Sequence, residues 1–228
     1  MSPDRLIRWV LKPIVFAAGL IPAAYMLWAA LNSQLGADPL KEITHETGDW
    51  ILRFIVITLA ISPLRRITGW NGAIKFRRML GLYAFFYGTL HFLIYVIADR
   101  FAGLDFQDGF LALSTVRALG ASIWEDIYKR PYITVGFTAF VAMIPLAVTS
   151  TTGWIRRMGG RNWQRLHRLI YLTAVAGVVH YWWLVKADIS RPAIYAALVA
   201  SLLGYRLALA LKKSRRRPQP ARVVSPVP

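Results

Sequence analysis

Three of the four histidines, His91, His167 and His180, lie inside long apolar stretches of the sequence. A neutral imidazole can bind iron or relay a proton, and ionisable side chains at membrane depth are functional candidates by default. The sequence contains no cysteine, which excludes disulfides, cysteine-ligated iron–sulfur clusters and thioether-linked haem. Histidine is therefore the strongest candidate ligand for iron in this chain.

His91 and His180 can reach the same depth in a bundle of helices. With helices predicted to start at residues 79 and 163, the two rings lie about 18 Å and about 26 Å above the inner ends, a difference within the variation of predicted ends and helix tilt. Two imidazoles on opposite sides of a planar macrocycle give a six-coordinate b-type haem suited to electron transfer. The spacing predicts one haem b in the outer half, with hydrogen-bonded structural histidines as the alternative.

The inner half of the bundle is less well specified. His167 precedes His180 by thirteen residues, so the two side chains point about 140° apart on an ideal helix. Each would need its own cofactor orientation or a tilted helix. A second ligand fourteen residues before His91 would be Arg77, which is a poor iron ligand but suits a haem propionate, a flavin phosphate or a quinone oxygen. We therefore predict that His167, Arg77 and Arg78 serve a second haem or another inner cofactor. The alternative for His167 is an interfacial histidine beside lipid phosphates.

Two further polar residues lie near the predicted outer face. His45 falls in a predicted outer loop, where a capping or surface hydrogen bond is its expected role. Arg53 lies just inside the outer end of the next apolar stretch. It can meet a haem propionate or snorkel to the membrane interface, and the sequence favours snorkelling slightly.

The composition indicates a membrane protein. Of the 228 residues, 56% are hydrophobic and 17% charged, whereas about a quarter of a soluble domain is charged. The mean hydropathy is +0.43. The net charge of +17 comes from short basic clusters between apolar runs, as in the loops on one side of a membrane. We therefore predict membrane lipid, and no nucleic acid, as a partner.

Six apolar stretches approach or exceed the roughly 20 residues that cross a bilayer. They cover residues 13–31, 48–64, 79–98, 132–152, 163–185 and 192–211. The predicted fold is all-α, a six-helix transmembrane domain over residues 1–212 followed by a basic, Pro-rich, disordered tail at 213–228. Between the third and fourth stretches, residues 109–129 show apolar positions at three- and four-residue spacing. This pattern predicts an amphipathic helix on the outer surface, either a lid over the bundle or a docking surface.

Basic clusters fall on alternate loops and set the predicted orientation. They are Arg65, Arg66, Lys75, Arg77 and Arg78, then Arg156, Arg157 and Arg161, and finally Lys212, Lys213, Arg215, Arg216 and Arg217. The opposite loops mix acids with bases. By the positive-inside rule both termini are cytoplasmic.

The remaining motifs indicate no further chemistry. The acids lie in predicted loops and three histidines in spans, so no Ser/His/Asp set is apparent. No Gly-rich phosphate loop follows a strand, and no alternation of strands and helices predicts an NAD-binding domain. If electrons come from a nicotinamide, another protein must deliver them.

Several segments together resemble the MsrQ (formerly YedZ) family, the haem-bearing membrane subunits of bacterial MsrPQ systems. They are Leu35–Pro39, His45, Thr47–Gly48, Thr58–Arg66, Arg77–Tyr83, His91, Lys129–Thr134, Pro145–Ser150, Trp163–Tyr171 and His180–Trp183. The wider resemblance is to ferric-reductase-like transmembrane domains, which include NADPH oxidases and iron reductases.

The resemblance implies a multi-pass protein of the bacterial inner membrane that carries haem b, with flavin mononucleotide (FMN) also associated with the family. Electrons would come from the quinone pool or a cytosolic flavin reductase. They would pass to MsrP, a periplasmic molybdopterin enzyme that reduces methionine sulfoxide in oxidised proteins, so substrate reduction is expected on the partner.

Carried over residue by residue, His91 and His180 are the expected axial ligands of the outer haem, and His167 is the third functional histidine. Two-haem relatives have paired histidines on both helices, and this chain departs from them at Arg77. The second haem therefore stays open, and no flavin motif is apparent. Two alternatives also stay open: a stand-alone ferric or cupric reductase, and a small proton-coupled transporter or channel without haem.

Overall fold

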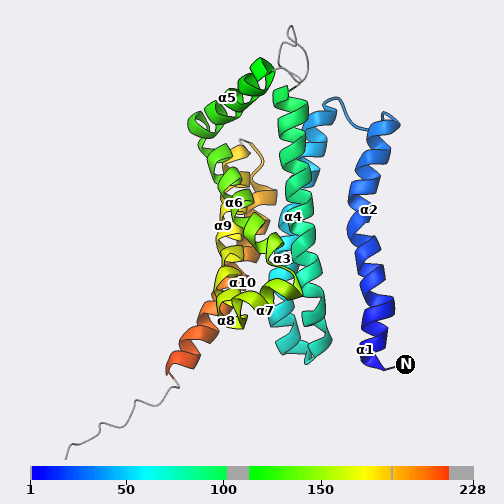
Figure 1. The fold of residues 1–228 in the computed structure, drawn as a ribbon, viewed down its shortest axis with the longest axis vertical. Helices are drawn as coiled ribbons and strands as arrows, with labels where there is room; N and C mark the ends of the chain where they lie inside the picture. The colour runs from blue at the N-terminus through cyan, green and yellow to red at the C-terminus, as the bar shows by residue number, and fades with distance from the viewer. Residues whose placement is uncertain (1, 102–112, 186, 216–228) are drawn as a thin grey trace, which may run out of the picture.

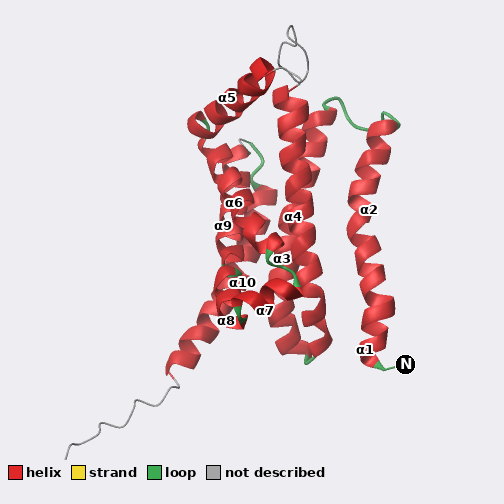
Figure 2. Cartoon of the chain, viewed as in Figure 1, coloured by secondary structure: helices red, strands yellow, loops and turns green. Residues whose placement is uncertain are grey.

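The computed structural model describes residues 2–101, 113–185 and 187–215, and within these ranges the chain is helical with no strand (Figures 1 and 2). Long helices run side by side along the molecule's long axis. The main elements are α1 (Pro3–Leu6), η1 (Ile7–Leu11), α2 (Lys12–Leu31), α3 (Pro39–Thr68), η2 (Asn71–Phe76), α4 (Arg77–Ile94), η3 (Tyr95–Phe101), α5 (Leu113–Lys129), α6 (Pro131–Val148), α7 (Thr152–Met158), α8 (Gly160–Leu166), α9 (Leu169–Leu184) and α10 (Ser190–Arg215).

Four helical segments of the described chain are long and apolar enough to cross a membrane. They are Pro3–Leu31, Asn71–Ala98, Pro131–Val148 and Ser190–Ser214, which confirms four of the six predicted stretches. The stretches at 48–64 and 163–185 are helical but are not among the four. Helix α3 has 30 residues but contains Asp49 and Arg53, and α9 has 16 residues, short of the roughly 20 that span a bilayer.

The second helix begins well before its predicted start at residue 48. The Asp38 side chain accepts a hydrogen bond from the Lys41 amide (3.1 Å), and Pro39 occupies the first helical position. Both features favour a helix start. The predicted outer loop around His45 is therefore wrong, because His45 lies within α3.

The prediction of one continuous helix over residues 163–185 is also wrong. The chain turns at His167 and Arg168, and α8 and α9 are separate helices. Amide hydrogen bonds to the residue three positions back, from Arg168 to Arg165 (3.2 Å) and from Tyr171 to Arg168 (2.9 Å), tighten the chain here.

Helix α2 is attached to α4 by two tyrosine hydroxyls. Pro22 lacks an amide hydrogen and disturbs the helix around it. Next to it, the Ala23 amide donates to the Tyr87 hydroxyl (3.1 Å), which in turn donates to the Gly19 carbonyl (2.8 Å). One turn earlier on α4, Tyr83 donates to the Phe16 carbonyl. These bonds let a proline-containing helix dock without losing the hydrogen bonds at its break.

The core lies mainly between α3 and α4, where aromatic rings stack. The Phe54 ring lies 5.1 Å from the Tyr83 ring and 5.5 Å from the Tyr87 ring, centre to centre. Ile55, Leu59 and Tyr87 are fully buried. This packing positions the N-terminal half of α3 beside the C-terminal half of α4.

Helix α5 is joined to the bundle through buried Asp126. Its carboxylate accepts from the Tyr95 hydroxyl (2.8 Å) and pairs with Arg100 and Arg130 (both 3.2 Å). This outcome confirms the amphipathic helix over Leu113–Lys129, while predicted residues 109–112 lie outside the described ranges. Ile123 and Ile127 face a cavity in the bundle, so α5 covers that cavity as a lid.

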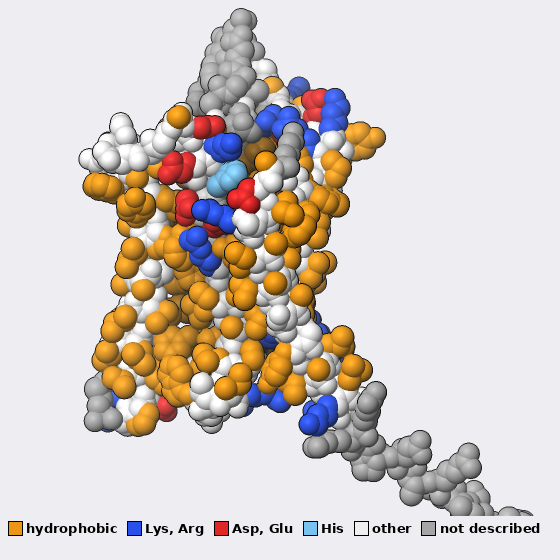
Figure 3. All heavy atoms as spheres, turned by 180° about the vertical axis from the view of Figure 1, so that it is seen from behind, with side chains coloured by type: hydrophobic (Ala, Val, Ile, Leu, Met, Phe, Trp, Pro, Cys, Tyr) orange, Lys and Arg blue, Asp and Glu red, His pale blue; other side chains and the backbone are white. Residues whose placement is uncertain are grey.

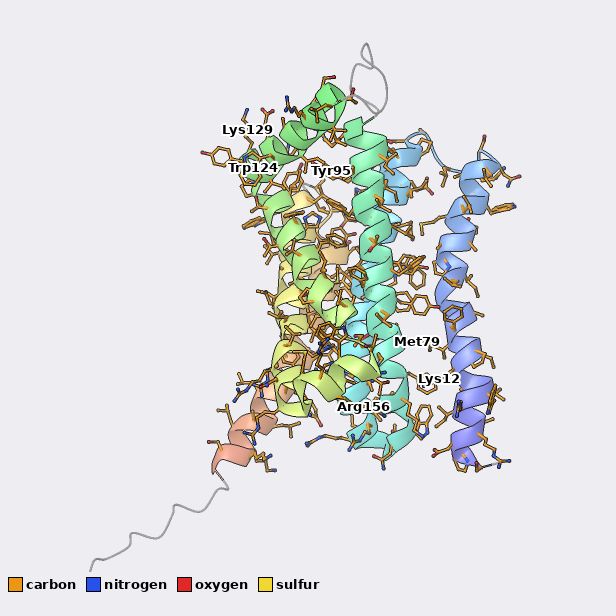
Figure 4. All side chains as sticks on the ribbon, viewed as in Figure 1. Lys12, Met79, Tyr95, Trp124, Lys129 and Arg156 are labelled. Carbon is orange, nitrogen blue, oxygen red and sulfur yellow. The ribbon has the colours of Figure 1, made fainter. Side chains whose placement is uncertain are left out.

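The two ends of the bundle differ in their charged residues. Figure 3 shows acidic and basic side chains together with a histidine near the α5 end, and a broad hydrophobic band below them. Lys12, Met79 and Arg156 lie at the opposite end from Tyr95, Trp124 and Lys129 (Figure 4). The N-terminus and the end of α10 share the end with the basic loops (Figure 1). Helix α10 continues into the predicted tail as far as Arg215, and residues 216–228 lie outside the described ranges.

Candidate functional site

His91 of α4 and His180 of α9 meet at one cavity inside the bundle. Their ring centres are 6.2 Å apart and their planes are 89° apart. The cavity has a volume of about 250 Å³ and is lined by both histidines together with residues of α3, α4, α6 and α9, and by α5 at its mouth. The structure thus brings together the two histidines that the sequence predicts as a pair.

The His91 ring is held by the backbone and a hydroxyl of α3. Its Nδ1 lies 3.0 Å from the Thr44 carbonyl oxygen and 3.2 Å from Thr47 Oγ1. A carbonyl can only accept, so Nδ1 carries the proton and donates. The single proton of the Thr47 hydroxyl goes to the carbonyls of Ile43 and Thr44 (2.8 and 2.9 Å). The proton assignment leaves the lone pair of His91 on Nε2.

The His180 ring is held in the same way by α6. Its Nδ1 lies 2.6 Å from the Tyr132 carbonyl oxygen, so it too donates, and its lone pair is on Nε2. Metal-binding histidines characteristically donate their other ring N–H to a carbonyl or carboxylate, which fixes the tautomer and the ring orientation. Both histidines show this arrangement.

A glycine lies one helical turn after each of the two carbonyls. Gly48 follows Thr44 by four residues, and Gly136 follows Tyr132 by four. A Cβ on Gly136 would lie 2.5 Å from Nδ1 of His180, closer than any side chain allows, whereas a Cβ on Gly48 would make ordinary contact at 3.5 Å with the His91 ring. The absence of a side chain at 136 is therefore what lets His180 reach its carbonyl.

The two rings meet the requirements of a haem-binding pair. Each has its lone pair on Nε2, and both line one cavity with their centres 6.2 Å apart. His91 and His180 would hold the haem iron, and the haem would supply one-electron transfer.

His167 has a different environment, at the turn between α8 and α9. Its Nε2 lies 3.1 Å from Thr149 Oγ1, and that hydroxyl gives its proton to the Pro145 carbonyl (2.6 Å). His167 therefore donates from Nε2 and keeps its lone pair on Nδ1. Its ring stacks on Trp163 at 3.8 Å between centres, and Trp163 Nε1 donates to the Thr149 carbonyl (2.9 Å).

Two basic side chains lie near this inner histidine. Arg77 and Arg78, at the start of α4, are near enough to His167 for their charges to act on it. Arg206 of α10 donates to the Leu59 carbonyl (2.6 Å) and lies 5.6 Å from the centre of the Tyr171 ring. The structure thus places Arg77 and Arg78 near His167, while their service to an inner cofactor stays a prediction. Arg206, which the sequence did not single out, lies within reach of the charge of Arg77.

Arg53 lies on the α2 side of α3. It pairs with Asp49 (3.6 Å) and Glu46 (3.9 Å), lies 4.4 Å from the Trp50 ring centre, and lines a second cavity between α2 and α3. Its role at a haem propionate stays a prediction. His45 instead lines the cavity of the histidine pair, although its surface role was predicted from a loop position.

Asp49 is a residue of this cavity that sequence reasoning missed. It is 3% exposed, and its Oδ2 lies 3.2 Å from Arg191. Its Oδ1 has no hydrogen-bond partner within the described ranges. A carboxylate at the start of the apolar stretch 48–64 is itself a signal of a functional site in the sequence.

Comparison with known proteins gives consistent results. Residues 47–178 match the family described as "Ferric reductase like transmembrane component". A protein of Xanthomonas oryzae pv. oryzae (strain MAFF 311018), named "Protein-methionine-sulfoxide reductase heme-binding subunit MsrQ", is 48% identical over 95% of this chain and 93% of its own length. The chain is also similar to two proteins with the same name. The one from Ralstonia nicotianae is 49% identical over 91% of this chain and 88% of its own length. The one from Herminiimonas arsenicoxydans is 44% identical over 93% of this chain and 90% of its own length. No solved structure matches the chain.

The family match covers more than half of the chain and includes His91 and His167, while the relatives align along almost its whole length. Its apolar helices and this family indicate an integral membrane protein. The chain therefore belongs to the MsrQ family of ferric-reductase-like transmembrane proteins.

Proposed function

We propose that this chain is the haem-binding membrane subunit of a methionine sulfoxide reductase system and conducts electrons across the bacterial inner membrane. The observation that carries the proposal is the pair of imidazoles 6.2 Å apart, each anchored through Nδ1 to a helix carbonyl. The names of its relatives, which describe heme-binding subunits of such reductases, support it.

His91 and His180 would hold one haem b from opposite sides. When bound, haem b supplies one-electron transfer. The carbonyls of Thr44 and Tyr132 keep both Nε2 atoms unprotonated and aimed by a fixed ring orientation. Two protein ligands would occupy both axial positions, which suits electron transfer and leaves no site for oxygen.

The orientation proposed here follows from the basic residues. The end with the Lys/Arg-rich loops would face the cytoplasm, and the end with α5 would face the periplasm. Electrons would enter near His167, Arg77 and Arg78 from the quinone pool or a cytosolic flavin reductase. A second haem or FMN could be held there, because His167 has its lone pair on Nδ1 and the guanidinium groups suit propionates or a phosphate.

The electron acceptor would be a periplasmic MsrP-like molybdopterin reductase. Electrons leaving the His91–His180 site would pass below α5 to this partner, which would reduce methionine sulfoxide in oxidised proteins. Repair chemistry would thus take place on the partner, with this chain as its electron source.

A reconstituted system tests the proposal directly. The reduced protein is placed in lipid vesicles and mixed with the periplasmic reductase and a methionine sulfoxide substrate. The partner should then convert the substrate to methionine while this protein is reoxidised. The His91→Ala variant should not support this conversion, while the His45→Ala variant, altered in the same cavity, should retain the activity. If reoxidation instead follows added ferric or cupric ion and never the partner, the chain is a stand-alone metal reductase.

A further inference from the structure

A second cavity lies between α2 and the N-terminal half of α3. Its volume is about 540 Å³, and Ala18, Pro22 and Met26 form its wall on α2. Helix α2 is fastened to α4 through Phe16, Gly19 and their tyrosine partners, so this cavity opens beside that attachment. It is separate from the histidine cavity, with which it shares no lining residue.

The dimensions of the apolar wall suit a lipid chain. From Ala18 to Met26 the wall rises about 12 Å along α2. Half of a hydrocarbon core of about 30 Å is similar in depth. The apolar wall is therefore long enough to lie along most of one acyl chain of a leaflet.

Opposite charges line the α3 side of the cavity. Glu42 and Glu46 are one helical turn apart on the same face of α3, and Arg53 follows two turns later. One oxygen of Glu42 accepts from the Gly36 amide (2.7 Å). The Arg53 pairs with Glu46 (3.9 Å) and Asp49 (3.6 Å) are longer than hydrogen bonds of about 2.7–3.2 Å. A phosphate oxygen at hydrogen-bond distance would therefore be a closer partner for Arg53 than either carboxylate.

We propose that this cavity binds one phospholipid whose headgroup carries both a primary ammonium and a phosphate. Glu42 and Glu46 receive the ammonium, Arg53 receives the phosphate, and an acyl chain lies along Ala18 and Met26. The two carboxylates repel the headgroup of an anionic lipid. A neutral quinone could accept a hydrogen bond from Arg53, but it has no cation to place between Glu42 and Glu46, so it fits less well.

Lipid competition tests this proposal. The full-length protein is reconstituted in nanodiscs that contain equal amounts of phosphatidylethanolamine and phosphatidylglycerol, extracted with detergent, and examined by native mass spectrometry. We expect one phosphatidylethanolamine retained per chain, with a preference of about five-fold over phosphatidylglycerol, which corresponds to about 1 kcal/mol. Equal retention of the two lipids, or retention of added long-chain benzoquinone in their place, would overturn the proposal.

Three variants separate the cavity from the general lipid belt. The double variant Glu42→Gln, Glu46→Gln should lose the headgroup preference, while Glu125→Gln on α5, the same change outside the cavity, should keep it. Ala18→Leu should reduce retention of the bound lipid whatever its headgroup. If the double variant still prefers phosphatidylethanolamine over phosphatidylglycerol, the proposal is contradicted. If that variant does not fold, the competition between the two lipids in the wild-type protein decides.

Discussion

At the scale of single residues, the two histidines owe their chemistry to the backbone opposite them. Each Nδ1 gives its proton to a helix carbonyl, from Thr44 or Tyr132, and each Nε2 keeps its lone pair. A histidine donating from Nε2 would present no ligand there. The carbonyl partners thus determine which ring nitrogen keeps a lone pair for a ligand.

Gly136→Ala should reduce haem retention, because the new Cβ would lie 2.5 Å from Nδ1 of His180 and displace the ring from the Tyr132 carbonyl. Loss of such an outer partner typically lowers metal affinity by about 10- to 100-fold. Haem per chain, measured by absorbance after purification, checks it.

Gly48→Ala is the matched control, since its Cβ would make only ordinary contact with the His91 ring at 3.5 Å. It should keep haem close to the wild-type level. Equal retention in both variants would show that Gly136 does not position His180.

The pairing of His91 and His180 could be predicted from the sequence, because helix rise alone brings the two residues to similar depth. The carbonyls of Thr44 and Tyr132 could not, since a backbone acceptor is present at every residue and only packing selects one. The glycine four residues after each carbonyl is visible in the sequence, but its meaning depends on which helices adjoin.

At the scale of elements, α2 depends on a hydroxyl from another helix. Tyr87 bridges the Ala23 amide and the Gly19 carbonyl where Pro22 breaks the helix pattern. The proline predicts such a break from the sequence. The hydroxyl that bonds to the backbone there belongs to Tyr87, 64 positions away from Ala23, and this contact could not be predicted.

Tyr87→Phe should lower the free energy of unfolding by about 2 kcal/mol, because it removes two hydrogen bonds and leaves buried groups unsatisfied. Thermal unfolding in detergent measures the change. Tyr128→Phe, at a side chain 82% exposed on α5, should leave the unfolding temperature unchanged. A Tyr87→Phe variant as stable as the wild type would contradict the bridging role.

Helix α5 depends on one buried carboxylate. Asp126→Asn should loosen α5 from the bundle, because Arg100 and Arg130 would lose the charge that neutralises them, and breaking a buried pair costs about 3–5 kcal/mol. Hydrogen exchange of α5 amides should accelerate by more than about ten-fold.

The neighbouring Glu125→Gln variant removes an exposed pair with Lys129 and should leave hydrogen exchange in α5 near the wild-type rate. Similar exchange in both variants would mean that Asp126 does not fasten the lid.

Helix boundaries were predicted less well than helix existence. Apolar stretches identify the long helices, but the early start of α3 and the turn at His167 depend on local bonds that hydropathy does not report. The capping signal at Asp38 and Pro39 was present in the sequence. The turn at His167 carries no proline or glycine, and it is held by contacts with Thr149 and Trp163.

At the scale of the whole molecule, the bundle separates two sites along its long axis. The His91–His180 cavity lies towards the end covered by α5, and His167 lies towards the end with the basic loops and both described termini. This separation is what an electron conduit between two compartments requires, and it places α9 between the proposed entry and exit sites.

The reduced-minus-oxidised absorbance spectrum of the purified protein tests the central claim most directly. The account predicts a b-type haem signal that is lost in His91→Ala and in His180→Ala and retained in His45→Ala. A colourless protein from haem-replete cells, or a signal unchanged when His180 is replaced, would contradict it.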